Sequence, residues 1–304
     1  MSHVAVLGSA NADLVVEVDR RPEAGETLLG SDLRVFAGGK GANQAASSAR
    51  SGAETSFIAC VGDDDHGSLL RTALADAGVD VAGMVRVDRP TGTALILVTP
   101  DGENSIVVSP GANHALDIDR ADAAAARWAD ADVLVLNLET PLPTVEHVAV
   151  AAAARGVRVL MNAAPAHPLR RDVLEVCDPL VVNEHEARIL ADGGDGSDSF
   201  EGLARILLDR GARSVVITLG SAGALHADAE GFGTVPSYAV DVVDTTGAGD
   251  AFVGAMACEL ARGVGLRDAV AFATAAAAVS VQSMGAQSSY PDRDAVERWL
   301  TTTF

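Results

Sequence analysis

From about residue 111 onward, the chain alternates between short apolar runs and longer amphipathic segments. The apolar runs predict strands, and the amphipathic segments predict helices. The expected strands cover residues 133–136, 157–160, 180–182 and 214–219, and the expected helices cover residues 143–155 and 200–209. Continuous β-branched strands with helices between them are typical of a parallel sheet covered on both faces. The sequence therefore predicts an α/β fold, a doubly wound, mostly parallel sheet flanked by helices.

The first 110 residues add a second pattern. Short extended segments are expected at residues 14–18, 27–29 and 33–36, with a hairpin at residues 93–99 and 105–108 across Pro100, Asp101 and Gly102. The α/β pattern returns at residues 4–7, 39–51, 56–60 and 67–77. We interpret the chain as a single domain, residues 1–304, from which a small sheet of about residues 12–36 and 91–109 projects. Such a sheet serves as a lid, as a dimer contact or as edge decoration, and the sequence leaves all three roles open.

The segment 242–252 has a pattern that indicates chemistry. Two valines, expected to end a strand, run into Thr-Thr-Gly-Ala-Gly-Asp and an apolar helix. Gly247 and Gly249 let the backbone approach a ligand closely, and the free N–H groups at the start of a helix, here expected at residues 251–262, bind anions. The helix dipole favours the ionised form of Asp250, which suits it to take a proton from a hydroxyl beside a bound phosphate. Helix capping alone is the alternative role for Asp250.

Two further polar segments lie near the N-terminus. Residues 37–46 place Lys40 among glycines before an expected helix. Residues 8–13 follow the first expected strand, at the end where α/β sheets bind ligands. Asn11 and Asp13 are two apart in an extended segment, so they point the same way and suit a pair of vicinal hydroxyls. Asn and Asp are also common turn residues, so neither segment alone indicates a ligand.

The charge of the chain limits its partners. The formal net charge is −20, which disfavours nucleic acid and anionic membranes. An anionic nucleotide needs local positive potential from N–H groups, a metal or a placed side chain. Of the 22 basic residues 21 are arginine, and the only lysine, Lys40, lies inside a glycine cluster. A compositional bias explains why lysine is rare. It does not explain why the remaining lysine lies in a glycine cluster. A role for Lys40 in a site is one explanation of this position, and survival by chance is the alternative.

The remaining composition predicts a cytoplasmic protein. No segment reaches the roughly 18 consecutive apolar residues of a membrane span. The N-terminus enters a strand-like run without the basic and apolar regions of a signal peptide. Cys60, Cys177 and Cys258 lack metal-ligand spacing and are expected to be reduced thiols.

The glycine-rich segments together resemble the signatures of a known family. Residues 38–45 and 244–250 are similar to the two signatures of the ribokinase (phosphofructokinase-B-type) family of sugar kinases. Shorter segments also match in order, at residues 11–13, 138–141, 162–166, 183–186, 218–223 and 285–287. The resemblance covers nearly the whole chain and is strongest to the ribokinases within the family.

The resemblance implies a role for each matching position. It implies a sugar pocket lined by Asn11, Ala12, Asp13, Gly39, Lys40, Gly41, Ala42, Asn43, Glu139 and Asp250. Asp250 is then the base that takes the proton from the attacking hydroxyl. Gly247, Ala248 and Gly249 form with it the anion hole for the transferred phosphoryl group.

The resemblance also implies the sites for nucleotide and ions. Asn183 and Glu186 are implied to lie near the phosphates of ATP and Mg²⁺. The residues implied to border the nucleotide are Thr218, Leu219, Gly220, Ser221, Ala222, Gly223, Gly249 and, close to the adenine, Thr274. A monovalent-cation site for K⁺ is implied at Asp244, Thr246, Ser280, Ser283, Gly285 and Ser289. Ser280 and Ser283 depart from the commonest family residues, at positions that often contribute main-chain oxygens.

The expected activity is ATP-dependent phosphorylation of a sugar hydroxyl, from D-ribose to D-ribose 5-phosphate. The joint presence of residues 11–13, residues 39–43 and Glu139 favours ribose. Other branches of the family share the glycine turn, so a kinase for another sugar or a nucleoside (adenosine, a ketohexose phosphate or a ketodeoxy sugar acid) is the alternative. A non-catalytic sugar sensor is the alternative from another class, and it has no need of a base at Asp250. The resemblance further implies a homodimer joined through the small sheet.

Overall fold

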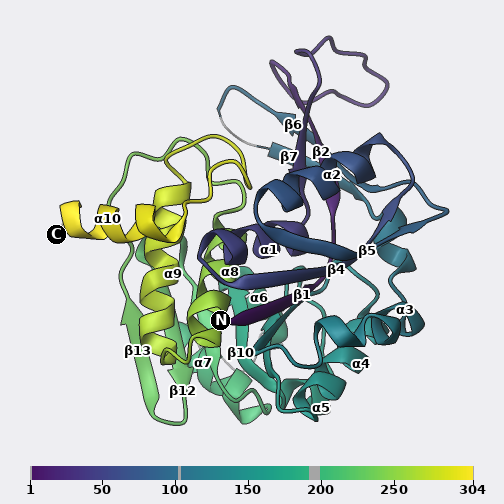
Figure 1. Cartoon of the computed structure of the whole chain (residues 1–304). Coiled ribbons are helices and arrows are strands. Elements are labelled where there is room, and N and C mark those ends of the chain that lie inside the picture. Colours follow the sequence, from purple (N-terminus) through teal and green to yellow (C-terminus); the bar gives the residue numbers. More distant parts are fainter. Residues whose placement is uncertain (1, 102–103, 192–198, 304) are drawn as a thin grey trace.

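The computed structural model describes residues 2–101, 104–191 and 199–303, and within these ranges the main sheet has nine strands (Figure 1). In spatial order they are β13 (Gly231–Val235), β12 (Ala224–Asp228), β11 (Val215–Thr218), β10 (Cys177–Asn183), β9 (Arg158–Asn162), β8 (Val133–Asn137), β1 (His3–Leu7), β4 (Glu54–Gly62) and β5 (Val79–Val87). The strands from β11 to β5 pair in parallel, and β12 and β13 extend the sheet antiparallel. This order confirms the predicted α/β architecture.

Helices cover both faces of this sheet because its strands are apolar on both sides. One face, which includes Val4 and Val6, packs against α1 (Lys40–Arg50), α2 (Asp65–Asp76), α8 (Ala248–Ala261), α9 (Leu266–Ser280) and α10 (Arg293–Thr303). The other, which includes Ala5 and Leu7, packs against α3 (Ile118–Ala123), α4 (Leu142–Ala153), α5 (Arg171–Leu174), α6 (Glu184–Leu190) and α7 (Phe200–Asp209). None of the helices in the described ranges combines the length and hydropathy that a membrane crossing requires.

A second sheet projects from this body and is here called the small sheet (Figure 1). Its four strands, all within the described ranges, lie in the order β3 (Arg34–Gly38), β2 (Asn11–Glu17), β6 (Gly92–Val98) and β7 (Asn104–Ser109). The β6–β7 hairpin is the predicted one, although Gly102 of its expected turn lies outside the described residues. Because β2 begins only four residues after β1 ends, the small sheet starts directly at the carboxyl end of the main sheet.

Two strand predictions were wrong. Residues 27–29 form no strand, and Leu29 is 96% exposed. Val242 and Val243 do not end a strand either, because residues 236–245 follow an irregular path. Val242 lines a cavity and Val243 is 57% exposed, so this apolar pair is not part of a sheet.

Candidate active site

The strand order of the main sheet reverses at β1, which has β4 on one side and β8 on the other. The carboxyl ends of β1 and β8 therefore lie at the topological switch point, where α/β proteins bind ligands, and this position is here called the crevice. Ser9 follows β1 and Glu139 follows β8, and Ser9 Oγ donates a hydrogen bond of 2.6 Å to Glu139 Oε2. The backbone N–H of Lys40 donates to the same oxygen at 3.3 Å. These two donors hold the Glu139 carboxylate at the crevice.

Asn11, the first residue of β2, is oriented by Asn113, which was not predicted as a site residue. Asn113 Nδ2 donates a hydrogen bond of 2.7 Å to Asn11 Oδ1. Asn113 Oδ1 in turn accepts from the N–H of Ala10 at 2.9 Å, and both asparagines are buried. With its oxygen engaged, Asn11 has its amide hydrogens left to offer to a ligand hydroxyl.

Asp13 follows Asn11 by two residues in β2, so the two side chains lie on the same face of the strand. It packs so closely against β3 that a Cβ at Gly38 would lie 2.1 Å from Asp13 Oδ2. Burial, together with the charges of Glu139 and Asp250, raises the pKa of the Asp13 carboxyl to about 7. Asp13 therefore changes its charge in the neutral range of pH.

Helix α1 brings the second polar segment to the crevice. Its N-cap residue Gly39 has a φ of 90°, and a Cβ there would lie 2.6 Å from the backbone N of Asn11. A Cβ at Gly41 would lie 2.7 Å from the backbone of Gly8, and the N–H of Ala42 donates to Ser9 O at 2.9 Å. Glycine is thus required for the start of α1 to pack against residues 8–11. This packing places the backbone N–H of Lys40 within hydrogen-bond distance of the Glu139 carboxylate.

Asp250 lies in the first turn of α8 and is buried. The helix starts at Gly247, whose φ of 74° belongs to the left-handed region that favours glycine. Both carboxylate oxygens of Asp250 accept hydrogen bonds from amides of α1. Asn43 Nδ2 donates to Oδ2 at 3.0 Å, and Gln44 Nε2 donates to Oδ1 at 2.9 Å. The predicted base therefore lies where the two glycine-rich segments meet, with its orientation fixed.

The backbone N–H groups beside Asp250 form part of the predicted anion hole. Among the described residues, no acceptor takes a hydrogen bond from the N–H of Gly249 or Asp250. The N–H of Ala248 differs, because the left-handed turn at Gly247 lets it donate to Thr245 O at 3.2 Å. An ideal Cβ at Gly249 would meet no protein atom within 4 Å. Glycine at this position is therefore not required by the packing of the protein.

A small cavity of about 160 Å³ adjoins this turn. Its walls include Lys40, Asn183, Glu186 and Asp250. The carboxylate of Asp250, with help from Glu139 and Glu186, raises the pKa of the Lys40 ammonium although burial acts to lower it. Burial raises the pKa of Glu186, although the Asn183 N–H and the charge of Lys40 act to lower it. The lone lysine thus supplies positive charge next to the helix start.

Asn183 and Glu186 are held together by a capping box at the start of α6. The N–H of Asn183 donates to Glu186 Oε2 at 2.8 Å, and the N–H of Glu186 donates to Asn183 Oδ1 at 2.8 Å. This arrangement fixes both side chains at the edge of the small cavity.

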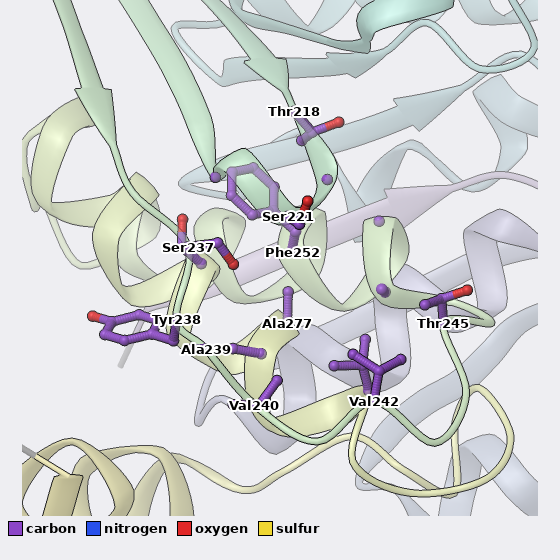
Figure 2. A pocket seen from close by; sticks show the side chains of 17 residues that line it. Thr218, Ser221, Ser237, Tyr238, Ala239, Val240, Val242, Thr245, Phe252 and Ala277 are labelled. Carbon is purple, nitrogen blue, oxygen red and sulfur yellow. The ribbon is translucent and has the colours of Figure 1, made fainter.

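A larger cavity of about 590 Å³ shares part of its lining with the small one. Figure 2 shows the side chains that line the larger cavity. Both cavities are lined by Thr218, Thr245, Ala248 and Gly249, so the helix start lies between them. Of the residues predicted to border a nucleotide, Gly220, Ser221, Gly223 and Thr274 also line the larger cavity, whereas Leu219 and Ala222 do not. Its other walls are mostly apolar and include Tyr238, Val240, Val242, Phe252 and Val281. The volume and the apolar lining suit a ligand of nucleoside size.

The predicted cation residues lie in the loop before α8 and in the segment from the last residue of α9 to Ser289, and these two parts of the chain meet. Thr246 donates to Asp244 Oδ1 through its N–H at 2.9 Å and its hydroxyl at 2.7 Å, and the N–H of Gly285 donates to Asp244 Oδ2 at 2.8 Å. Partial burial acts to raise the pKa of Asp244, but these hydrogen bonds outweigh it and hold the pKa below its usual value. The hydroxyls of Ser280 and Ser289 donate to backbone carbonyls of Ala277 and Ala286. Ser283 is exposed.

Two further residues from the C-terminal part reach this site and were not predicted as site residues. Tyr290 is buried, and its hydroxyl donates to Gly247 O at 3.0 Å, which braces the turn before α8. Gln287 Nε2 donates to Asn43 Oδ1 at 3.0 Å, which orients the amide that faces Asp250. Gln287 lies in the segment 285–287 that matched the family, but no role was predicted for it, and Tyr290 lies outside the matching segments. Each residue acts on a partner far away in the sequence.

A buried carboxylate at a glycine-turned helix start, between a polar crevice and a nucleoside-sized cavity, defines a phosphotransferase of the small-molecule kinase class. The chain belongs to the pfkB family of carbohydrate kinases, whose model matches residues 1–293. This confirms the resemblance of its signatures.

Relatives match over nearly the full chain. The ribokinase of Schizosaccharomyces pombe is 41% identical over 303 residues, covering 96% of this chain and 95% of that protein. The deoxyribokinase of Salmonella typhi is 35% identical over 301 residues, covering 98% of each chain. The solved structure of Arabidopsis thaliana ribokinase complexed with ribose and ATP has a TM-score of 0.92 and 35% identity, covering 99% of both chains.

Proposed function

We propose that the protein transfers the γ-phosphoryl group of ATP to D-ribose and forms D-ribose 5-phosphate. The observation that carries this proposal is the position of Asp250, which lines the small cavity at the start of α8 and lies close enough to Asp13 to act on the pKa of that carboxyl. The Arabidopsis relative was solved with ribose and ATP, and its fold covers the same length of chain. The polar crevice suits the sugar, and the larger cavity suits the nucleoside of ATP.

The reaction needs little covalent chemistry from the protein. Asp250 accepts the proton of the ribose 5-hydroxyl, whose oxygen forms the new bond to the γ-phosphorus. The bond between this phosphorus and the bridging oxygen breaks, and ADP leaves with its electron pair. The transition state is loose, so positioning and charge stabilisation dominate. The free N–H groups of Gly249 and Asp250 and the ammonium of Lys40 are suited to stabilise the charge on the transferred group.

The donors at the small cavity fit Mg²⁺ as part of a nucleotide complex. Within the described residues, no group of three or more His, Cys, Asp or Glu side chains is arranged to hold a metal by itself. Mg²⁺ is commonly bound through one or two carboxylates together with substrate phosphates and waters. Glu186 is the carboxylate that lines this cavity beside Asn183 and is suited to this role. Bound there, Mg²⁺ supplies positive charge to the phosphates.

We place the K⁺ site around Asp244, at the two parts of the chain that meet there. Hard cations take carboxylate and carbonyl oxygens, and Asp244 is held as an anion by the hydrogen bonds from Thr246 and Gly285. The hydroxyls of Ser280 and Ser289 donate their hydrogens to backbone carbonyls, which leaves their oxygen lone pairs, so these residues can offer either hydroxyl or main-chain oxygens to the ion. The ion then supports the loop that precedes the helix start of Asp250.

We also propose a homodimer joined through the small sheet. The register places Val35, Leu14, Leu95 and Val107 side by side across its four strands, on the face opposite Asp13. Leu95 is 51% exposed and Val107 is 64% exposed. An apolar row of this kind is suited to pack against its counterpart in a second copy.

A panel of acceptors assayed with ATP tests the function. The panel contains D-ribose, 2-deoxyribose, adenosine, a ketohexose phosphate and a ketodeoxy sugar acid, each with K⁺ and with tetramethylammonium. We expect D-ribose to give the highest kcat/KM and K⁺ to raise turnover. A higher kcat/KM for another acceptor would replace ribose in this proposal. ADP release that is absent with every acceptor would instead favour a sugar sensor.

A further inference from the structure

Gln44 makes an unusual pair of contacts inside the core. It lies on α1 with no exposed surface, where an apolar side chain is the ordinary choice. Its Nε2 donates to Asp250 Oδ1 at 2.9 Å and to Asn162 Oδ1 at 2.9 Å. An amide nitrogen carries two hydrogens, so both are used in these contacts. Gln44 therefore joins α1 to Asp250 on α8 and to Asn162 at the end of β9.

The direction of this amide is set by its neighbours. If it were reversed, Gln44 Oε1 would face two oxygen atoms at 2.9 Å, and one of them is a carboxylate oxygen. The amide therefore has one allowed orientation, which leaves Oε1 buried with no partner among the described residues. A buried acceptor without a partner is destabilising. Gln44 therefore donates to Asp250 in an orientation that is unfavourable for the stability of the core.

The other carboxylate oxygen of Asp250 has a different environment. Oδ2 accepts from Asn43, whose own Oδ1 accepts from Gln287. Asn43 lies in the first turn of α1, beside Lys40 at the crevice, whereas Gln44 faces the core. The chain has three glutamines, and two of them orient this group of amides. Oδ1 is thus held from the core side, and Oδ2 from the side where the sugar is proposed to bind.

We propose that Gln44 is a positioning residue that anchors Oδ1 of Asp250 and leaves Oδ2 as the oxygen that takes the proton. This inference rests on the proposed function. When the sugar binds, its hydroxyl replaces the Asn43 amide at Oδ2 and then transfers its proton there. Oδ1 remains an acceptor for Gln44 both before and after the transfer, so this hydrogen bond survives the step. Oδ2 changes from acceptor to donor and therefore needs the exchangeable partner.

Two variants of Gln44 and a control test this role. Gln44→Met removes the donor at similar volume. Gln44→Glu introduces a carboxyl that can donate to Asp250 when protonated and repels it when ionised. Gln282→Met is the matched control, because Gln282 follows α9 and its Nε2, among the described residues, donates only to Ala278 O at the end of that helix. For each protein, kcat and KM with D-ribose and ATP are measured from about pH 5.5 to 8.5, beside its Tm.

We expect Gln44→Met to lower kcat roughly 10- to 100-fold at every pH, with KM for ribose changed less than about threefold. For Gln44→Glu, the ratio of its kcat to that of the wild type falls as pH rises. Gln282→Met behaves as the wild type. A loss that appears in Tm alone, or a Gln44→Glu ratio independent of pH, overturns the inference. If Gln44→Glu does not fold, Gln44→Met decides, and an unchanged kcat overturns the inference. A wild type inactive on every acceptor contradicts the proposed function instead.

Discussion

Asp13 and Lys40 show how far the fold changes the properties of single side chains. Asp13 retains its proton up to about pH 7 because burial and two neighbouring carboxylates oppose its ionisation. Lys40 is held as a cation by the carboxylates around it, Asp250 above all. The sequence predicted both residues as part of a site. It did not predict the pKa of Asp13, because Glu139 and Asp250 are more than 100 residues away along the chain.

The pKa of Asp13 predicts a pH dependence of sugar binding. An ionised carboxylate accepts hydrogen bonds from two hydroxyls, whereas a protonated one is a weaker acceptor. We therefore expect ribose to bind more tightly as pH rises through about 7. Calorimetric titration of ribose at a series of pH values measures this. In Asp13→Asn the affinity is lower, roughly tenfold or more at pH 8, and independent of pH in this range. A dependence that persists in the variant would contradict the assignment.

The Asp13 carboxyl also predicts that the stability of the folded protein falls as pH rises, whereas its affinity for ribose increases. In the unfolded chain Asp13 ionises near its ordinary value of 3.8, whereas the folded protein keeps the proton to about pH 7. The folded state therefore binds more protons between these values, and its stability falls as pH rises through them. We expect Asp13→Asn to raise the Tm near pH 8 and to leave it nearly unchanged near pH 4. A Tm that falls at both pH values would show a packing role for the carboxylate instead.

At the scale of elements, local sequence chemistry predicted the helix starts better than the loops. The glycine turn at Gly247 marked the beginning of α8, since a positive φ and a free helix start are local properties. The strand predicted to end at Val242 and Val243 is absent, because Val242 lines a cavity and Val243 is exposed. Asn113, Gln287 and Tyr290 could not be predicted as site residues, because each acts across more than 40 residues of sequence.

Substitution by alanine is expected to have opposite effects on stability at Gly249 and at Gly247. Gly249→Ala adds a methyl group that meets no protein atom and replaces a glycine inside a helix, so stability rises by about 0.5–1 kcal/mol. Its kcat/KM for ATP falls, because the methyl group projects into the space between the two cavities. Denaturant unfolding and steady-state kinetics measure both effects. Normal turnover by this variant would contradict the ligand position.

Gly247→Ala is the matched comparison. Its Cβ would lie 2.5 Å from the Tyr290 hydroxyl, and the φ of 74° disfavours any residue with a Cβ. We expect a loss of about 1–3 kcal/mol in the free energy of unfolding, together with lower turnover. A variant as stable as the wild type would show that this turn can change its conformation.

At the scale of the whole molecule, the alternation of strands and helices was sufficient to predict the main sheet and the projection of the small one. The predicted parallel pairing holds from β11 to β5, because apolar strands covered on both faces have a distinctive pattern. No strand was predicted at residues 79–87, where β5 forms one edge of this sheet. The antiparallel β12–β13 edge was not predicted either, since both strands are five residues long and contain Ala, Asp or Gly, which are depleted in strands. The sequence left the role of the small sheet open, because a dimer contact is a property of two copies of the chain.

The apolar row of the small sheet predicts the oligomeric state. Sedimentation or light scattering is expected to show a dimer for the wild type and a monomer for Leu95→Asp, since a charge at the centre of the row opposes its burial. Ile118→Asp is the control, because Ile118 is also exposed but lies on α3, away from the small sheet. A wild type that is monomeric at all concentrations, or a dimer that Leu95→Asp leaves intact, contradicts the proposed interface.

The central claim is that Asp250 is the base of a sugar kinase. Asp250→Asn keeps the shape of the side chain and removes its ability to take a proton. We predict that its kcat for ribose and ATP falls about 10²- to 10⁴-fold, while ribose affinity, measured by calorimetry, changes less than about threefold. A variant that turns over ribose at a rate near that of the wild type would contradict the claim.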